Sequence, residues 1–291
     1  MAVSERIVHT SHADISVAET SGKKGAILLI HGNSSCKEVF RNQLNGPLGE
    51  EYRLIAMDLP GHGKSTDAVN PERTYCWPGY AETAIEVLEG LGIKQAAVYG
   101  WSLGGHAAIE MIPRFPGLAG LMISGTPPVS MTPESIQTGF RANPAVALFG
   151  KAEWSDEEVN MLAQGLYGPA CDDVLRNALK RTDGRSRPLL FASLWAGKAS
   201  DQKALAENAP MPLAIVDGAD DPVVNTGYIA SLKIRNLWEG HYHLLRGLGH
   251  VAFLTAPETF NPIFARFARD MALRAAEGQK KTAARSQVAA A

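Results

Sequence analysis

The feature that most restricts how this chain folds is a short turn at residues 100–104. The turn reads Gly-Trp-Ser-Leu-Gly and stands between a strand-like run at 96–99 and a helix-like run at 105–111. A strand that turns directly into a helix holds the residue at its tip in a strained backbone conformation and projects its side chain outwards. Glycines two positions before and after Ser102 keep Cβ atoms out of the turn. The pattern therefore predicts an accessible serine hydroxyl in front of a helix N-terminus.

Apolar runs rich in Val, Ile and Leu alternate with helical patterns along much of the chain. These runs lie at 27–30, 54–57, 96–99, 118–123, 213–216 and 242–245. The first five have the composition of parallel strands buried on both faces. Helices are predicted at Tyr80–Leu91, which stops at Gly92, and at Ser102–Ile112, which stops before Pro113. Alternating residues near 7–17 predict a leading antiparallel hairpin. The fold class is therefore α/β, with a doubly wound, mostly parallel sheet.

This alternation stops after residue 123 and returns only at residue 213. The chain between them reads as helices and loops interrupted by prolines. We therefore expect residues 1–125 and 209–275 to form the α/β core and residues 126–208 to form a helical cap. The tail at 276–291 is small and polar without an apolar face, which predicts disorder.

Composition excludes several classes of protein. The chain has 291 residues, a net charge of −2 and no basic stripe, so neither nucleic acid nor an anionic membrane is an expected partner. Its apolar runs are too short to span a bilayer, and no secretory leader is visible at the start. Three cysteines without a C-x-x-C pair predict reduced thiols and a cytoplasmic location.

A serine hydroxyl is a weak nucleophile that needs a base, and the base needs an orienting acid. In a doubly wound sheet these groups lie at the carboxyl ends of strands. The strand at 213–216 runs into Asp217, Asp220 and Asp221, and the strand at 242–245 runs towards His250. The chain thus has nucleophile, acid and base in the order Ser, Asp, His, with three candidates for the acid.

These residues resemble the α/β-hydrolase family, which implies that fold with a helical cap. The family's acid usually ends a G-x-x-D turn, which matches Asp221 and leaves Asp217 and Asp220 as weaker candidates. His250 matches the family's base, so the resemblance implies a triad of Ser102, His250 and Asp221. His31-Gly32-Asn33 is similar to the family's oxyanion loop, with the amides of Asn33 and Leu103 as the expected oxyanion donors.

Longer segments narrow the resemblance to the metal-independent N-acyl-homoserine lactonases, which are quorum-quenching enzymes. The matching segments are 31–35, 58–68, 100–106, 109–112, 125–129, 181–185 and 237–240. The resemblance implies lactone ring opening on a small-molecule substrate without cofactor or metal. This chain has Asp221 where that group carries Glu. A ligand-holding cap tyrosine of that group falls on or near Leu162, and Tyr167 is a possible substitute. His62, in the segment 58–68, is read as structural.

The predicted substrate pocket combines core and apolar cap residues. Its candidates are Asn33, Trp101, Phe140, Trp154, Leu162, Tyr167 and Trp195, with Phe149, Phe191 and Leu194 as further apolar residues of the cap. Packing of the cap on the core would place the same side chains equally well. His241 and His243 form an H-x-H pair, which we read as two residues on one face of a strand and not as a metal site. His106, four residues after Ser102, is read as packing.

Three alternatives to a lactonase remain open at this point. The first is a carboxylesterase with another substrate preference. The second is a carbon–carbon bond hydrolase, which shares the order Ser, Asp, His. The third is a receptor of the same fold that binds its ligand without turnover.

Overall fold

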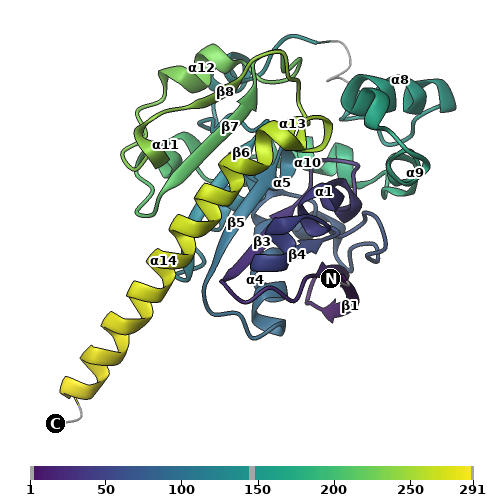
Figure 1. The fold of residues 1–291 in the computed structure, drawn as a ribbon. Coiled ribbons are helices and arrows are strands. Elements are labelled where there is room, and N and C mark those ends of the chain that lie inside the picture. Colours follow the sequence, from purple (N-terminus) through teal and green to yellow (C-terminus); the bar gives the residue numbers. More distant parts are fainter. Residues whose placement is uncertain (1–2, 144–147, 290–291) are drawn as a thin grey trace.

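The computed structural model describes residues 3–143 and 148–289 and contains one eight-stranded sheet (Figure 1). The strand order is β1-β2-β4-β3-β5-β6-β7-β8, and every neighbouring pair from β4 to β8 is parallel. The strands are β1 Ser4–His9, β2 Asp14–Glu19, β3 Ala26–Ile30, β4 Arg53–Met57, β5 Ala96–Trp101, β6 Leu118–Ser124, β7 Leu213–Gly218 and β8 His243–Leu245. The predicted mostly parallel sheet is confirmed, as is the leading hairpin, since β1 and β2 pair antiparallel.

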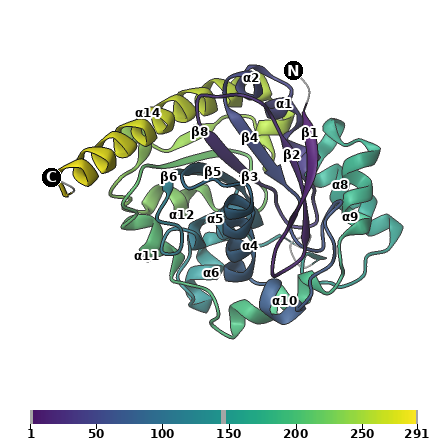
Figure 2. The same ribbon diagram turned by 90° about the horizontal axis from the view of Figure 1, so that it is seen from below.

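The central strands are apolar because both of their faces are covered. Along β5, Val98 faces one core layer while Ala97 and Tyr99 face the other, as the two-residue repeat of a strand requires. Figure 2 shows α4 (Trp77–Gly90) and α5 (Leu103–Glu110) on one side of the strands and α14 (Pro257–Ala289) on the other. The remaining helices of the core are η1 Lys37–Phe40, α1 Arg41–Leu44, α2 Pro47–Glu51, α3 Pro71–Thr74, α12 Thr226–Ser231, η3 Trp238–Gly240 and α13 Ala252–Thr255.

The chain between β6 and β7 forms the helical insertion that the sequence predicts as a cap. Within the described residues it contains helices and no strand, although an isolated bridge joins Phe140 to Val224. Its helices α8 and α9 lie side by side in both views (Figures 1 and 2). The helices of the insertion are α6 Pro133–Gly139, α8 Asp156–Tyr167, η2 Gly168–Ala170, α9 Asp173–Arg181, α10 Ser186–Trp195 and α11 Gln202–Glu207.

Helix α14 is the long element that projects from the body in Figure 1. Its first turns pack on the sheet through Phe260, Phe264 and Phe267, whose spacing places them on one helix face. The helix then continues to Ala289, over most of the segment for which composition predicts disorder. That segment has six Ala, two Lys and two Gln, residue types with high intrinsic helix propensity. The last two residues lie outside the described part of the chain.

Two expectations from composition can be compared with the structure. Cys36, Cys76 and Cys171 are all free thiols, as predicted. Among the described residues, no helix has the length and apolar character needed to cross a membrane.

Candidate active site

Ser102 occupies the sharp turn between β5 and α5. Its backbone has φ 54° and ψ −119°, in a region that residues with a Cβ rarely adopt. Two contacts with the end of β6 hold this conformation: the Ser102 amide donates to the Ser124 carbonyl at 2.8 Å, and the Thr126 hydroxyl donates to the Ser102 carbonyl at 2.9 Å. The predicted strained turn therefore exists, and its serine stands at the carboxyl end of the sheet.

The glycines around Ser102 are required by close backbone approach. A Cβ on Gly100 would lie 2.3 Å from the Gly104 carbonyl oxygen, and one on Gly104 would lie 2.1 Å from the Ile30 carbonyl oxygen. A Cβ on Gly105 would lie 2.1 Å from the Thr126 hydroxyl. Any side chain at these positions would separate β5 from α5 or α5 from β3. The G-x-S-x-G-G pattern is thus a packing requirement of the turn.

His250 and Asp221 form a buried pair. His250 Nδ1 lies 2.7 Å from Asp221 Oδ2, and the other Asp221 oxygen accepts the amides of Val223 at 2.7 Å and Val224 at 3.1 Å. Burial alone would raise the pKa of Asp221, but the charge of His250 and these hydrogen bonds outweigh burial and lower it. Burial likewise opposes charge on His250, yet the Asp221 carboxylate raises the pKa of that imidazole. Asp221 is therefore suited to fix the tautomer of His250.

The other two acid candidates are placed differently. Asp217 is buried, accepts the Gly125 amide at 2.5 Å and accepts the Tyr242 hydroxyl at 2.7 Å. Burial raises its pKa to about 7. Asp220 is exposed on the turn. Of the three carboxylates, the one in contact with the His250 ring is that of Asp221.

Two further contacts set the position of His250. The Trp101 indole N–H donates to the His250 carbonyl at 2.9 Å. The ring lies so close to Gly125 that a Cβ there would be 2.5 Å from His250 Cε1, and Gly125 has φ +61°. Trp101 precedes Ser102, so the turn that carries Ser102 also holds the backbone of His250.

The loop after β3 begins with His31, which is structural, and places Asn33 in the wall of the cavity. The buried His31 ring donates from Nδ1 to the Gly32 carbonyl at 2.7 Å and accepts the Leu59 amide at Nε2 at 3.0 Å. Burial lowers the pKa of His31 to about 4, so the ring is neutral. His62 is also fully buried and donates to the Pro60 carbonyl at 2.9 Å, in agreement with its structural reading.

Asn33 and Leu103 both line the cavity beside Ser102. The first amides of a helix have no acceptor within the helix, and Leu103 is the first residue of α5. Within the described residues, the amides of Asn33 and Leu103 donate to no protein acceptor. Both residues with the predicted oxyanion amides therefore line the cavity that contains Ser102.

A cap residue reaches this loop through a chain of hydrogen bonds. Ser34 has φ 55°, and its hydroxyl donates to Asn33 Oδ1 at 2.9 Å. The same hydroxyl accepts from Arg187 Nη1 at 3.2 Å. Arg187 lies at the start of α10 with 3% of its surface exposed, and it also donates to the carbonyls of Lys151 at 2.6 Å and of Ala152. Burial lowers the pKa of Arg187 to about 10, so it remains a cation at neutral pH.

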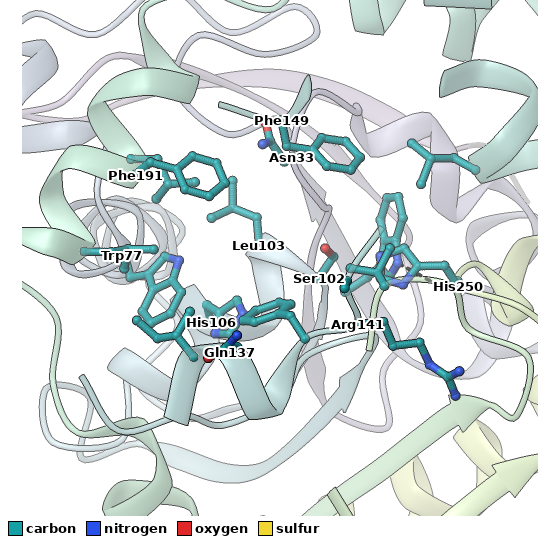
Figure 3. Close-up of a pocket in the computed structure, with 18 of the residues that line it drawn as sticks. Asn33, Trp77, Ser102, Leu103, His106, Gln137, Arg141, Phe149, Phe191 and His250 are labelled. Carbon is teal, nitrogen blue, oxygen red and sulfur yellow. Dashed lines mark hydrogen bonds between the residues drawn. The ribbon is translucent and has the colours of Figure 1, made fainter. Parts of the chain in front are cut away.

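An apolar cavity of about 290 Å³ opens between the core and the cap. Figure 3 shows Ser102 and His250 on one side of it and Trp77 and Phe191 on the opposite side. Of the predicted pocket residues, those that line it are Asn33, Trp101, Phe140 and Trp195, together with Phe149, Phe191 and Leu194.

Three predicted pocket residues do not line this cavity. Leu162 is 3% exposed because it lies on the face of α8 that packs into the core. Tyr167 is fully buried, and its hydroxyl donates to the Ser35 hydroxyl at 3.0 Å. Trp154 stacks under Arg187, whose Cζ lies 3.9 Å from the ring centre. All three side chains pack within the cap or against the core. This agrees with the alternative expectation that apolar cap residues serve packing and not substrate binding.

Several residues that line the cavity carry no recognisable signal in the sequence. Trp77 stacks on His106 with ring centres 4.0 Å apart, and both reach the cavity wall. His106 Nδ1 lies 2.7 Å from Gln202 Oε1, and burial lowers its pKa to about 4. The reading of His106 as packing is thus correct, but its position four residues after Ser102 also brings it to the pocket. The other such residues are Ile136, Gln137, Arg141, Ala142, Leu166, Leu190 and Val223.

Comparison with known proteins identifies the family of this chain. The model of the alpha/beta hydrolase family matches residues 27–263. The chain belongs to the alpha/beta hydrolase family. Its structure superposes with a TM-score of 0.90 on a mutant of the N-acyl homoserine lactonase AidH complexed with N-hexanoyl homoserine, at 42% identity over 93% of this chain and 98% of that one.

More distant hydrolases also align over most of their length. A pimeloyl-[acyl-carrier protein] methyl ester esterase of Nitrosospira multiformis is 26% identical over 86% of this chain and 97% of its own. A 2-hydroxy-6-oxononadienedioate/2-hydroxy-6-oxononatrienedioate hydrolase of Pseudomonas sp. is 25% identical over 88% of this chain and 92% of its own. These relatives support a hydrolase and cover esterase and carbon–carbon bond chemistry.

Proposed function

We propose that this protein is a serine hydrolase that opens the lactone ring of N-acyl homoserine lactones. The observation that carries the proposal is the placement of Ser102 and His250 in one apolar cavity, with Asp221 on the far nitrogen of the imidazole. The 42% identity to a lactonase over nearly the whole chain supports this choice among ester-cleaving reactions.

In this proposal Ser102 Oγ attacks the lactone carbonyl, and His250 Nε2 accepts the hydroxyl proton. Asp221 keeps the second imidazole proton on Nδ1 and stabilises the imidazolium. The negative charge that develops on the carbonyl oxygen is held by the amides of Asn33 and Leu103. One such donor contributes about 2.7–4 kcal/mol to transition-state stabilisation in serine hydrolases.

Ring opening then follows from collapse of the tetrahedral intermediate. The bond between the carbonyl carbon and the ring oxygen breaks, and His250 returns its proton to the departing alkoxide. Because the substrate is cyclic, that alcohol remains attached to the acyl group on Ser102. A water molecule deprotonated by His250 attacks the acyl-enzyme, and N-acyl homoserine leaves while the proton returns to Ser102.

The cavity suits a substrate with a polar head and an apolar tail. Asn33 and Ser102 both line the cavity, and the side across from Ser102 carries Trp77, Phe191 and other apolar side chains (Figure 3). We place the lactone at the serine and the acyl chain along this wall. The predicted holding role of a cap tyrosine falls to neither Leu162 nor Tyr167, since both face away from the cavity.

The test is to incubate the protein with N-hexanoyl homoserine lactone in EDTA and to follow the products by mass spectrometry. The proposal predicts a product heavier by one water that closes again to the lactone on acidification. Release of free hexanoic acid would mean amide cleavage and would overturn it. Turnover of p-nitrophenyl esters without turnover of the lactone would instead indicate a plain esterase. Binding of the lactone without turnover of either compound would indicate a receptor.

A further inference from the structure

A second cluster of chemically active side chains lies in the turn before β8, outside the cavity of Ser102. It consists of Glu239, His241 and His243. Glu239 and Gly240 both have left-handed backbone conformations, with φ 54° and 71°. This turn places the Glu239 carboxylate beside His243, the first residue of β8. The H-x-H pair is visible in the sequence, whereas this backbone geometry brings the carboxylate to it.

The spacing of the three groups matches a transition-metal site. One potential ligand atom from each residue lies within 4.8 Å of the other two. His243 Nε2 and Glu239 Oε2 are 3.3 Å apart. A tetrahedral zinc ion with bonds of about 2.0–2.1 Å holds neighbouring ligand atoms roughly 3.3–3.4 Å apart. These two atoms already have the separation that such an ion requires.

The side chains are also held ready to bind. His243 is 93% buried at its side chain, and within the described part of the chain its Nε2 makes no well-aligned hydrogen bond, although the Glu239 carboxylate lies 3.3 Å away. A buried nitrogen without a partner is unfavourable, and a bound cation would remove that cost. His241 Nδ1 lies 3.0 Å from the Glu239 carbonyl oxygen, a contact of the kind that orients metal-binding histidines through their second nitrogen.

Neighbouring residues fix the carboxylate without using all of its acceptor capacity. Arg266 of α14 donates to both Glu239 oxygens, at 2.9 and 3.0 Å. A carboxylate has about four lone-pair positions, so each oxygen can still accept a metal bond. The Trp238 ring packs 5.3 Å from the His243 ring and closes the inner side of the cluster.

We propose that Glu239, His241 and His243 bind one divalent transition-metal ion. Two imidazoles and one carboxylate in a compact arrangement favour zinc over calcium or magnesium, with water completing the coordination. None of the three residues lines the cavity of Ser102. The ion therefore clamps the turn to the edge strand β8 and stabilises the fold, while ester or lactone hydrolysis proceeds without it.

The experiment uses full-length protein without a histidine tag, stripped with EDTA and dialysed. Calorimetric titration with Zn²⁺ and visible absorption on addition of Co²⁺ should reveal one site per chain. His241→Ala, at an exposed ligand, should weaken binding at least about tenfold and abolish the rise in melting temperature that Zn²⁺ causes. His243→Ala and Glu239→Gln should also weaken Zn²⁺ binding.

His9→Ala is the matched control, because His9 is exposed and its ring contacts Asp14 on the opposite edge of the sheet. This variant should bind Zn²⁺ as the wild type does. The proposal is overturned if the wild type binds no stoichiometric Zn²⁺, or if His241→Ala binds it as tightly as the wild type. Folding of His241→Ala, checked by circular dichroism, keeps that comparison valid even if His243→Ala is unstable.

Discussion

Removal of the Ser34 hydroxyl is the sharpest test of how the cap acts on catalysis. That hydroxyl accepts from Arg187 and donates to Asn33 Oδ1, so it links a buried cap cation to the loop that carries one proposed oxyanion donor. Ser34→Ala keeps the Cβ and therefore retains most of the backbone strain at φ 55°. We expect the variant to fold with Asn33 released from its fixed orientation.

The expected loss follows from the bonds that are removed. A hydrogen bond to a charged group contributes about 1.5–3 kcal/mol, and about 1.4 kcal/mol corresponds to a tenfold change in rate. If most of this energy serves to position Asn33, kcat/KM falls about 10- to 100-fold. The complete loss of one oxyanion donor, about 10²–10³-fold in kcat, sets the upper limit.

The assay is kcat/KM with a p-nitrophenyl ester and with N-hexanoyl homoserine lactone. Arg187→Met should give a loss of activity similar to that of Ser34→Ala, and the double variant should lose little more, because the two residues act through one chain of bonds. Ser193→Ala is the control, since this buried cap hydroxyl donates to the Leu190 carbonyl of its own helix. A folded Ser34→Ala variant with wild-type kcat/KM on both substrates would refute the positioning role.

Three further predictions concern the proposed mechanism. Asp221→Asn should reduce kcat by about 10⁴-fold because the imidazole loses its correct tautomer. Asp217→Asn should keep kcat within about tenfold of wild type. Equal losses of kcat for the two variants in steady-state assays would contradict the assignment of Asp221 as the acid. His250 must be neutral to accept a proton, and its pKa is raised above the usual value of about 6.5. We therefore expect kcat/KM to fall with decreasing pH around a midpoint above about 6.5. A lower midpoint in the pH profile would count against His250 as the base. Lengthening the acyl chain from butanoyl to hexanoyl buries two more methylene groups at about 0.8 kcal/mol each. We therefore expect kcat/KM to rise by roughly tenfold. A kcat/KM that does not change with acyl-chain length would argue against acyl binding along the apolar wall.

The sheet and the turn at Ser102 were predictable because their local sequence leaves few choices. A strand buried on both faces must be apolar throughout, which is why the runs that form β3, β4 and β5 stand out. The turn needs glycine wherever β5, α5 and β3 approach one another. The rule that functional side chains lie where parallel strands end brought out His250 and three candidate acids. The choice of Asp221 among those acids came from the resemblance to the α/β-hydrolase family.

The cap was less predictable because apolar residues there serve two purposes. Leu162 and Leu166 lie on one helix and are both apolar, yet Leu162 packs into the core while Leu166 lines the cavity. Periodicity identifies an apolar face without saying which layer covers it. The Glu239 carboxylate was missed for a different reason, since left-handed backbone at a glutamate has no sequence signal.

The most direct test of the central claim compares wild type with Ser102→Ala on N-hexanoyl homoserine lactone in the presence of EDTA. Ser102 is the proposed nucleophile and contributes no packing that Ala would lose, so the variant should fold normally. We predict that the wild type opens the lactone ring without added metal and that Ser102→Ala loses at least about 10⁴-fold in kcat/KM. Ring opening by Ser102→Ala at a rate near that of the wild type would contradict the proposed mechanism.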